Sequence, residues 1–216
     1  GTTAYTVTVT DALNCSAVQT VNIIVNNLPI TNDTELNFCG DATHPGEFLL
    51  TDAQLSPGFP NTNSNSGADV DDGAANMTVT YHATLADAQN GSGNLSSPYS
   101  APNGTAIFAR VESNTTGCFS IATILLTVNI SPENVEIQNI NNGNSPADFT
   151  ICEQDQINLT VDEGIGGTSP FSYSWVAPDG TLFFTENIVI FPVLPSSHNG
   201  QWQVTVTDVN GCTNTD

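Results

Sequence analysis

The sequence has no lysine, and Arg110 is its only strong base, against 22 acidic side chains in 216 residues. A formal net charge of −21 repels phosphate backbones and anionic lipid headgroups. This argues against nucleic acid and membrane surfaces as partners. It favours either high ionic strength, which screens the self-repulsion, or bound divalent cations. Without lysine an intramolecular Lys–Asn isopeptide bond is excluded, so we expect disulfides to supply any covalent bracing.

Several motifs are also missing. No apolar run is long enough to span a bilayer, so we expect no membrane insertion in this segment. The chain opens directly into a strand pattern, and any export signal or anchor is expected outside it. There is no Gly-x-Ser-x-Gly or His-Glu-x-x-His, and His44, His82 and His198 lie in turn or strand-flanking contexts, so we predict no catalytic residue. The absence of Cys-x-x-Cys and of Cys/His clusters argues against zinc.

One stretch occurs three times, almost unchanged at Tyr5–Cys15 and Trp202–Cys212 and in looser form at Ile107–Cys118. In each copy apolar and polar residues alternate, which is the period of a strand with one buried face, and a turn and a cysteine follow. A unit repeated at domain-sized spacing indicates a tandem array. Many short strands with frequent turn signals predict an all-β protein of tandem immunoglobulin/PKD-like antiparallel β-sandwiches.

The repeat divides the chain into three parts. We expect residues 1–27 to be the last two strands of a preceding immunoglobulin-like domain. Residues 28–131 should form one immunoglobulin-like sandwich. Residues 132–216 should form a PKD/immunoglobulin-like sandwich that lacks its final strand, because the chain stops soon after Cys212.

The five cysteines follow the same division. Cys118 and Cys212 end their repeats, whereas Cys39 and Cys152 stand early in their domains. The economical pairing is Cys39 with Cys118 and Cys152 with Cys212, each closing a loop worth roughly 4 kcal/mol in the chain-entropy model. Cys15 then stays unpaired within these residues. Cysteines used in this way indicate an oxidising setting, extracellular or at the cell surface.

Three motifs resemble a known repeat type: Cys152-Glu-x-Asp-x-Ile-x-Leu, Tyr173-x-Trp175-x-x-Pro178-x-Gly180 and Gly200-x-Trp-x-Val-x-Val-Thr-Asp-x-x-Gly-Cys212. They look like the PKD/immunoglobulin-like repeats of very large secreted Bacteroidota proteins. Tyr81-His-Ala-Thr-Leu-Ala-Asp-Ala-Gln-Asn-Gly91 and Thr116-Gly-Cys118 are similar to a second repeat type in the same proteins. The resemblance implies a gliding-motility or adhesion protein exported by the type IX system. It also implies an Asp-rich, calcium-like loop after the first cysteine, of which only Asp41 is kept here.

Clustered carboxylates suggest a cation site elsewhere. Asp69, Asp71 and Asp72 precede Gly73 and could hold calcium with oxygen ligands, but the stretch lacks the full Asp-x-Asp-x-Asp-Gly pattern and its distal Glu. An acidic, solvated loop explains the same residues. A second set of candidates follows the repeat strands: Asp11, Glu112 and Asp208. Arg110 and Glu112 lie two positions apart on one strand face, so we predict a surface ion pair between them.

These observations predict a structural or adhesive segment of a long extracellular repeat protein, a cell-surface fibre or gliding adhesin. Its expected partners are neighbouring repeats of the same chain, with surface polysaccharide or another copy of itself as further candidates. One alternative is a carbohydrate-binding or spacer module of a secreted polysaccharide-degrading enzyme, for which the candidate sugar-stacking side chains are Phe59, Tyr99, Phe183 and Phe184. Another alternative is a filament that assembles by strand exchange.

Overall fold

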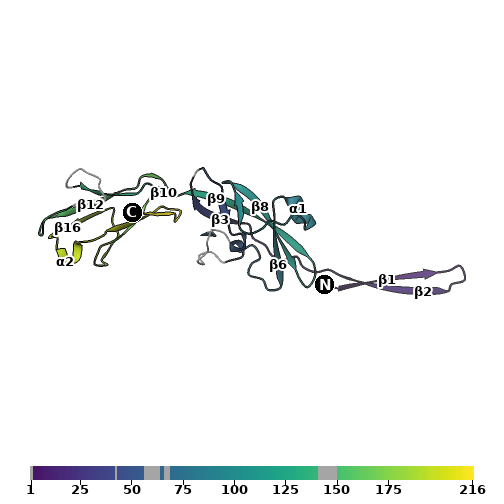
Figure 1. The fold of residues 1–216 in the computed structure, drawn as a ribbon. Coiled ribbons are helices and arrows are strands. Elements are labelled where there is room, and N and C mark those ends of the chain that lie inside the picture. Colours follow the sequence, from purple (N-terminus) through teal and green to yellow (C-terminus); the bar gives the residue numbers. More distant parts are fainter. Residues whose placement is uncertain (1, 42, 56–63, 66–68, 141–149) are drawn as a thin grey trace.

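The computed structural model describes residues 2–41, 43–55, 64–65, 69–140 and 150–216. An N-terminal hairpin, a middle sandwich and a C-terminal sandwich follow one another along a long axis (Figure 1). Within the described residues the helical elements are one or two turns long: η1 (Leu50–Gln54), α1 (Leu85–Asn90) and α2 (Pro195–His198). The protein is therefore all-β, as the alternating pattern predicts.

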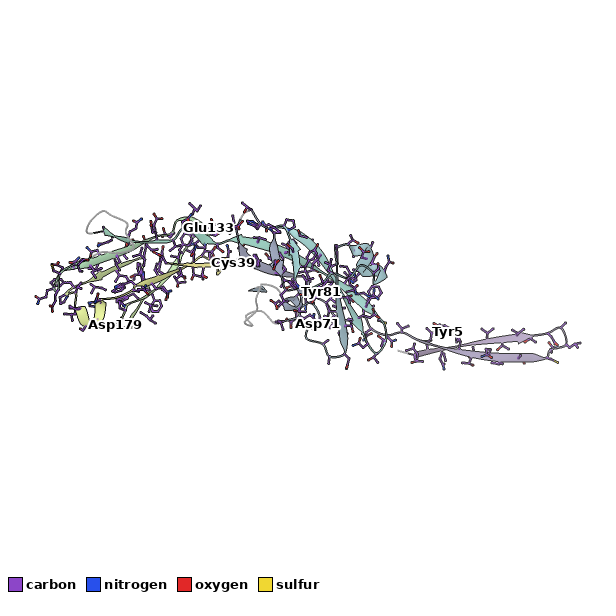
Figure 2. All side chains as sticks on the ribbon, viewed as in Figure 1. Tyr5, Cys39, Asp71, Tyr81, Glu133 and Asp179 are labelled. Atoms are coloured by element: carbon purple, nitrogen blue, oxygen red, sulfur yellow. A yellow bond between two sulfur atoms is a disulfide. The ribbon has the colours of Figure 1, made fainter. Side chains whose placement is uncertain are left out.

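The N-terminal hairpin consists of β1 (Thr2–Thr10) and β2 (Ser16–Ile24), paired antiparallel along their full length. Tyr5, Val7, Val9, Val21 and Ile23 share one face, but every described residue of both strands is exposed. Tyr5 on this face projects into open space (Figure 2). An isolated two-stranded hairpin is only marginally stable in water, so we expect the apolar face of this hairpin to pack against another structural element.

The middle sandwich is built on one five-stranded sheet, in the order β5-β3-β9-β8-β6. Its strands are β3 (Thr34–Gly40), β5 (Ser64–Asn65), β6 (Met77–His82), β8 (Thr105–Ser113) and β9 (Phe119–Ile130). The small second sheet pairs β4 (Gly46–Phe48) with β7 (Tyr99–Ala101). β3 runs parallel to β9, whereas the remaining neighbours are antiparallel.

The core of the middle sandwich comes from the inward positions of both sheets and from η1. Its largest fully buried side chains are Leu36, Phe48, Leu50, Ile107, Ile124 and Leu126. Tyr81 closes one side, where its hydroxyl accepts a hydrogen bond from Gln54 Nε2 at 2.6 Å. Burial raises the pKa of Tyr81 to about 12, because the phenolate would lose its hydration there.

The C-terminal sandwich has a three-stranded and a four-stranded sheet. The first is β11-β12-β16 and the second is β15-β14-β17-β18. The strands are β11 (Glu136–Asn139), β12 (Ile157–Asp162), β14 (Ser172–Val176), β15 (Leu182–Phe183), β16 (Asn187–Ile190), β17 (Gln203–Thr207) and β18 (Thr213–Thr215). In chain order this is A-B-E against C′-C-F-G, the arrangement of an immunoglobulin-like domain. A separate pair, β10 (Pro132–Glu133) and β13 (Ile165–Gly166), lies at the junction with the middle sandwich.

A buried tryptophan on the third strand is a feature of immunoglobulin cores, and Trp175 on β14 is fully buried here. Its indole Nε1 donates to the Thr185 carbonyl at 2.8 Å, so the polar end of the ring is satisfied. Val204 and Val206 of β17 pack in the same core. The expectation that this domain lacks its final strand is wrong. β18 follows Cys212 directly and pairs with β17.

The predicted ion pair between Arg110 and Glu112 is confirmed, with Nη2 and Oε2 2.7 Å apart. The guanidinium does more than pair with one carboxylate. Its Nη1 donates to the Ala88 and Gln89 carbonyls at 3.1 Å each, near the end of α1, and its plane lies over the Phe119 ring. The only strong base in the sequence therefore ties α1 to the sheet.

We expect Arg110→Lys to lower the free energy of unfolding by about 2 kcal/mol, because an ammonium cannot reach both carbonyls and the carboxylate with one planar fork. Urea denaturation measures this. Glu112→Gln is the matched control. It neutralises only the partly exposed carboxylate and leaves the contacts to α1, so it should cost less than about 1 kcal/mol. Equal losses in the two variants would contradict the helix-tethering role.

Candidate functional site: a disulfide across the domain junction

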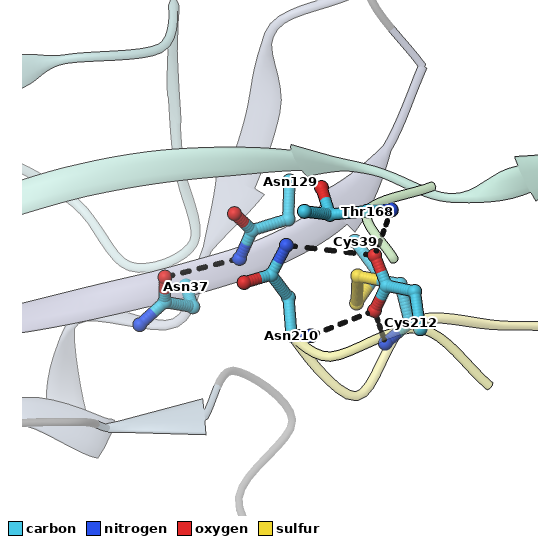
Figure 3. The surroundings of a disulfide bond; sticks show 7 residues. Asn37, Cys39, Asn129, Thr168, Asn210 and Cys212 are labelled. Atoms are coloured by element: carbon cyan, nitrogen blue, oxygen red, sulfur yellow. Dashed lines mark hydrogen bonds between the residues drawn. A yellow bond between two sulfur atoms is a disulfide. The ribbon is translucent and has the colours of Figure 1, made fainter. Parts of the chain in front are cut away.

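One disulfide joins the two sandwiches. It links Cys39 of the middle sandwich to Cys212 of the C-terminal sandwich, with the Cα atoms 5.4 Å apart and a sequence separation of 173 residues (Figure 3). Cys15, Cys118 and Cys152 are free thiols in the structure. The bond therefore braces the contact between the domains and not the interior of either one.

The alternation of β3 determines where Cys39 points. Leu36 is buried and Phe38 packs against the core, so Asn37 and Cys39 lie on the opposite face of the strand. Cys39 is in register with Asn129 on β9, whose side-chain amide donates to Asn37 Oδ1 at 3.1 Å. Since β3 and β9 run parallel toward the junction, Cys39 lies at the end of the sheet that faces the next domain.

Cys212 is held by the tight turn between β17 and β18. Asp208 begins this turn, and its Oδ1 accepts hydrogen bonds from the backbone amides of Asn210 at 2.9 Å and Cys212 at 2.8 Å. The backbone amide of Asp208 also donates to the Cys212 carbonyl at 2.9 Å. Gly211 supplies the left-handed residue, with φ of 85°. Cys212 and Asp208 are both buried, so a buried carboxylate fixes the backbone that carries the bonded sulfur of Cys212.

The same carboxylate reaches a neighbouring segment. Asp208 Oδ2 accepts a hydrogen bond from the Thr168 amide at 3.0 Å, and the Thr168 carbonyl accepts one from the Val209 amide at 3.0 Å. Asp208 was one of the weaker cation candidates in the sequence. In the structure its two oxygens are instead used to organise the turn that carries Cys212.

Backbone hydrogen bonds hold the chain where it passes from one domain to the next, beside the disulfide. Only Ser131 separates β9 from β10, and its amide donates to the Gly40 carbonyl at 2.8 Å. Gly164, just before β13, lies so close to β10 that a Cβ at this position would clash with the Glu133 carbonyl oxygen. The Asn214 side chain donates to the Pro132 carbonyl at 2.8 Å. The two domains are thus connected by a one-residue link, by the Ser131–Gly40 hydrogen bond and by a covalent bond, whereas the β10–β13 pair and Asn214 hold the first residues of the C-terminal domain to the rest of it.

A polar turn follows Cys39. The Asp41 carboxylate accepts hydrogen bonds from the Thr43 hydroxyl and from the backbone amides of Thr43 and His44. The Thr43 hydroxyl and amide, followed by His44, hold the pKa of Asp41 well below its usual range. This carboxylate, expected as the remnant of a calcium-like loop, closes a local turn.

The predicted pairing of Cys39 with Cys118 is wrong. Cys118 precedes Phe119, the first residue of β9, whereas Cys39 faces Asn129 near the end of the same strand. Ten residues of strand separate these positions by about 33 Å. A disulfide requires Cα atoms within about 7 Å, so the parallel pairing of β3 with β9 rules out this bond.

The predicted pairing of Cys152 with Cys212 is wrong for a similar reason. β12 ends near the junction, since Ile165, three residues beyond it, pairs with Glu133. Cys152 precedes the start of β12, and nearby Gln154 donates to the Val193 carbonyl next to α2. Figure 1 places α2 at the end of the C-terminal sandwich that lies away from the middle one. Cys152 and Cys212 therefore occupy opposite ends of their domain.

The structure does not gather the calcium candidates into one ligand set. Asp71 Oδ1 accepts from the Gly73 amide, and Asp72 Oδ1 accepts from Asn32 Nδ2, which also donates to the Asp69 carbonyl. Within the described ranges no three His, Cys, Asp or Glu side chains converge as metal ligands. Calcium at Asp69, Asp71 and Asp72 stays a prediction.

The aromatic side chains proposed for sugar stacking have different surroundings. Tyr99 packs against the core of the middle sandwich, and Phe183 packs against the core of the C-terminal sandwich beside Trp202. Phe184 is 70% exposed. Phe59 lies outside the described residues. The structure thus brings no two of the described three together as a stacking surface.

The described part of the chain contains no helix that is long and apolar enough to cross a membrane.

Part of the chain matches a known family model. Residues 39–132 match a family model described as the Flavobacterium inter-domain disulphide bond domain, FIDD. The matched stretch begins at Cys39 and covers less than half of the chain. No curated protein sequence matches the chain.

Solved immunoglobulin-domain structures align along most of the chain but only loosely. The N-terminal eight immunoglobulin domains of Down Syndrome Cell Adhesion Molecule, isoform 1.30.30, give 10% identity and a TM-score of 0.36, covering 99% of this chain and 30% of that one. The four-domain structure of Dscam1 isoform 6.9 gives 10% identity and a TM-score of 0.32, covering 94% and 50%. The chain thus spans half or less of these structures, and the immunoglobulin-like assignment rests on its strand order.

Proposed function

We propose that the chain is a structural segment of a long extracellular repeat protein, in which covalently linked sandwiches keep a fixed end-to-end arrangement under load. The observation that carries this proposal is the Cys39–Cys212 bond across the domain junction. Inter-domain interfaces inside a chain normally permit relative motion unless they are large and apolar. A disulfide placed there, beside a one-residue link, opposes hinge motion that packing alone would allow.

The chemistry of the chain supports a non-catalytic role. Its buried carboxylate Asp208 is saturated by backbone amides, and its buried His82 is bonded at both ring nitrogens, to the Thr80 hydroxyl and the Ser92 carbonyl. Both groups therefore make structural hydrogen bonds. Disulfides persist in oxidising compartments, which supports an extracellular or cell-surface location.

A cell-surface fibre or gliding adhesin exported by the type IX system is the specific form we propose. The repeat motifs that resemble large Bacteroidota surface proteins support it, as does a family model named for Flavobacterium. The proposed partners are the neighbouring repeats. Surface polysaccharide or a further copy of the chain would be contacted through the acidic outer surface, and calcium bound there would stiffen the array.

The test is a comparison of inter-domain motion with and without the bond. We expect Cys212→Ser to broaden the distribution of distances between probes on the two sandwiches, measured by single-molecule fluorescence transfer or by small-angle scattering. Cys15→Ser is the matched control, because Cys15 stands at the same position of an equivalent turn but is free. An unchanged distribution in Cys212→Ser would mean that packing alone fixes the junction, and the proposed role of the bond would be lost.

A further inference from the structure

The turn of the N-terminal hairpin has the same hydrogen bonds as the turn between β17 and β18. The aspartate Oδ1 accepts from the cysteine amide, at 2.9 Å from Asp11 to Cys15 and at 2.8 Å from Asp208 to Cys212. In both turns the aspartate amide donates to the cysteine carbonyl at 2.9 Å. The two hairpins are therefore copies of one unit, and each position of β1 has an equivalent on β17.

The strand register of the two copies agrees as far as Asp216. In the N-terminal hairpin Val7 pairs with Gln19. At the equivalent position Val204 and Asp216 exchange backbone hydrogen bonds of 2.8 and 3.0 Å. From this position on the copies differ, because β2 continues to pair with β1 as far as Ile24, whereas β18 and its pairing end here.

The difference leaves one edge of the C-terminal sandwich open beside Trp202. In the N-terminal hairpin the equivalent residue, Tyr5, is paired with Val21 of β2. Within the described residues no strand lies beside Trp202 on the edge of β17 that β18 follows. The indole is only partly buried, and its ring centroid lies 6.3 Å from that of His198. The N-terminal hairpin therefore has a strand where the C-terminal sandwich has an open edge.

A cavity lies at this open edge, and we call it the Trp202 cavity. It has a volume of about 600 Å³, and its apolar lining includes Ile137, Ile151, Ile157, Leu159, Val193 and Trp202. Ile157 and Leu159 belong to the sandwich core, so the cavity opens onto the core. Asp216 also lines it, and Asp216 Oδ2 accepts from the Ile137 amide of β11 at 2.7 Å. The Trp202 cavity therefore lies between β11 and β17, in line with β18.

The chemistry of the Trp202 cavity suits an extended strand. Every second side chain of such a strand would point into the cavity, and its backbone would pair with the edge of β17. In the N-terminal hairpin the residues at the corresponding inward positions are Val21 and Ile23. Glu153 and Asp216 line the cavity, and in a chain of net charge −21 they disfavour an acidic occupant. The occupant is therefore apolar at alternate positions and has no acidic side chain.

We propose that the Trp202 cavity binds a β-strand that continues β18 along β17 and has the sequence pattern of residues 20–27. Its inward side chains cover Trp202 and contact Ile157 and Leu159. Because β18 already runs toward the cavity, the occupant is joined to the end of β18 and is not a separate peptide. Such a strand binds whether or not the Cys39–Cys212 bond is present, so this site is independent of the proposed load-bearing role.

The test adds this strand to the full chain. In the matched variant the sequence Thr-Val-Asn-Ile-Ile-Val-Asn-Asn, copied from residues 20–27, follows Asp216 directly. In the first control one serine stands between Asp216 and the same sequence. A slip of one residue turns every side chain to the other face, so this control places threonine and asparagine inward. The second control keeps the matched register and has serine in place of the copied Val21 and Ile23.

We expect the matched variant to raise the urea midpoint of the C-terminal sandwich by about 1 M, because two further apolar side chains become buried. Acrylamide should also quench the tryptophan fluorescence less. Trp175 is already fully buried, so this change reports on Trp202. Both controls should behave as the unmodified chain. Equal midpoints and equal quenching in the matched variant and the controls would overturn the proposal.

A free peptide of the same sequence tests whether the strand has to be joined to β18. At equal concentration it lacks the high effective concentration that attachment provides, so we expect no protection of Trp202 from acrylamide. Protection as complete as in the matched variant would contradict an occupant in line with β18. The inter-domain distance measurement on Cys212→Ser is unaffected by any of these results, so the two proposals fail separately.

Discussion

Pulled from its two ends with the Cys39–Cys212 bond intact, the chain should extend only through residues 1–39 and 212–216. The bond closes a loop that contains nearly all of both sandwiches, and force applied at the ends passes through the two sulfurs instead of the enclosed backbone. Reduction should release the enclosed backbone. With the cysteines 173 positions apart in sequence and at most about 3.5 Å per extended residue, the added contour length is about 600 Å.

Single-molecule force spectroscopy with and without reductant measures this change. Cys15→Ser is the control and should behave as the unmodified chain, because Cys15 closes no loop in the structure. Bonds within each sandwich would give a different record. Residues 119–151 would then extend before reduction, and reduction would release two smaller loops. That record would contradict the inter-domain bond.

Asp208→Ala should lower the free energy of unfolding of the C-terminal sandwich by about 3 kcal/mol. The carboxylate accepts three backbone hydrogen bonds from Thr168, Asn210 and Cys212 in a buried turn. Alanine leaves these amides without acceptors, and each hydrogen bond to a charged group is worth about 1.5–3 kcal/mol, although such losses are not additive. Urea denaturation monitored by the fluorescence of buried Trp175 measures the effect.

The N-terminal hairpin offers a matched control for this substitution. Asp11 accepts the same two turn hydrogen bonds, but its turn is exposed and water can replace the lost acceptor. Asp11→Ala should therefore cost less than about 1 kcal/mol. A loss as large as that of Asp208→Ala would show that burial is not the cause. Asp208→Asn should lie between them, since one amide oxygen remains to accept.

Local pattern predicted most of the fold. Alternation located strands such as β6, β8 and β17, and Trp175 in the middle of its domain was a sufficient sign of an immunoglobulin-like core. Alternation states which face of a strand is buried, but it does not state which strand lies beside it or in which direction it runs. No local sequence pattern indicated the parallel pairing of β3 with β9. This pairing alone moves Cys39 to the opposite end of the sandwich from Cys118.

A sequence signal for the correct pairing did exist. Asp11 precedes Cys15 by four residues, and Asp208 precedes Cys212 by the same spacing. This spacing marks a capped hairpin turn at one end of the domain, whereas Cys39, an early cysteine at an outward-facing strand position, marks the other end. Bonds between such positions must cross a junction. The chemistry of Asp208 could not be predicted, because its third donor, Thr168, comes from a distant segment.

Peptide mapping without reduction tests the central claim most directly. The sequence has no lysine and a single arginine, so cleavage at aspartate and glutamate must replace trypsin. A peptide containing Cys39 joined to a peptide containing Cys212 is the predicted product. Linkage of Cys39 to Cys118, or of Cys152 to Cys212, would contradict a covalent bond between the sandwiches.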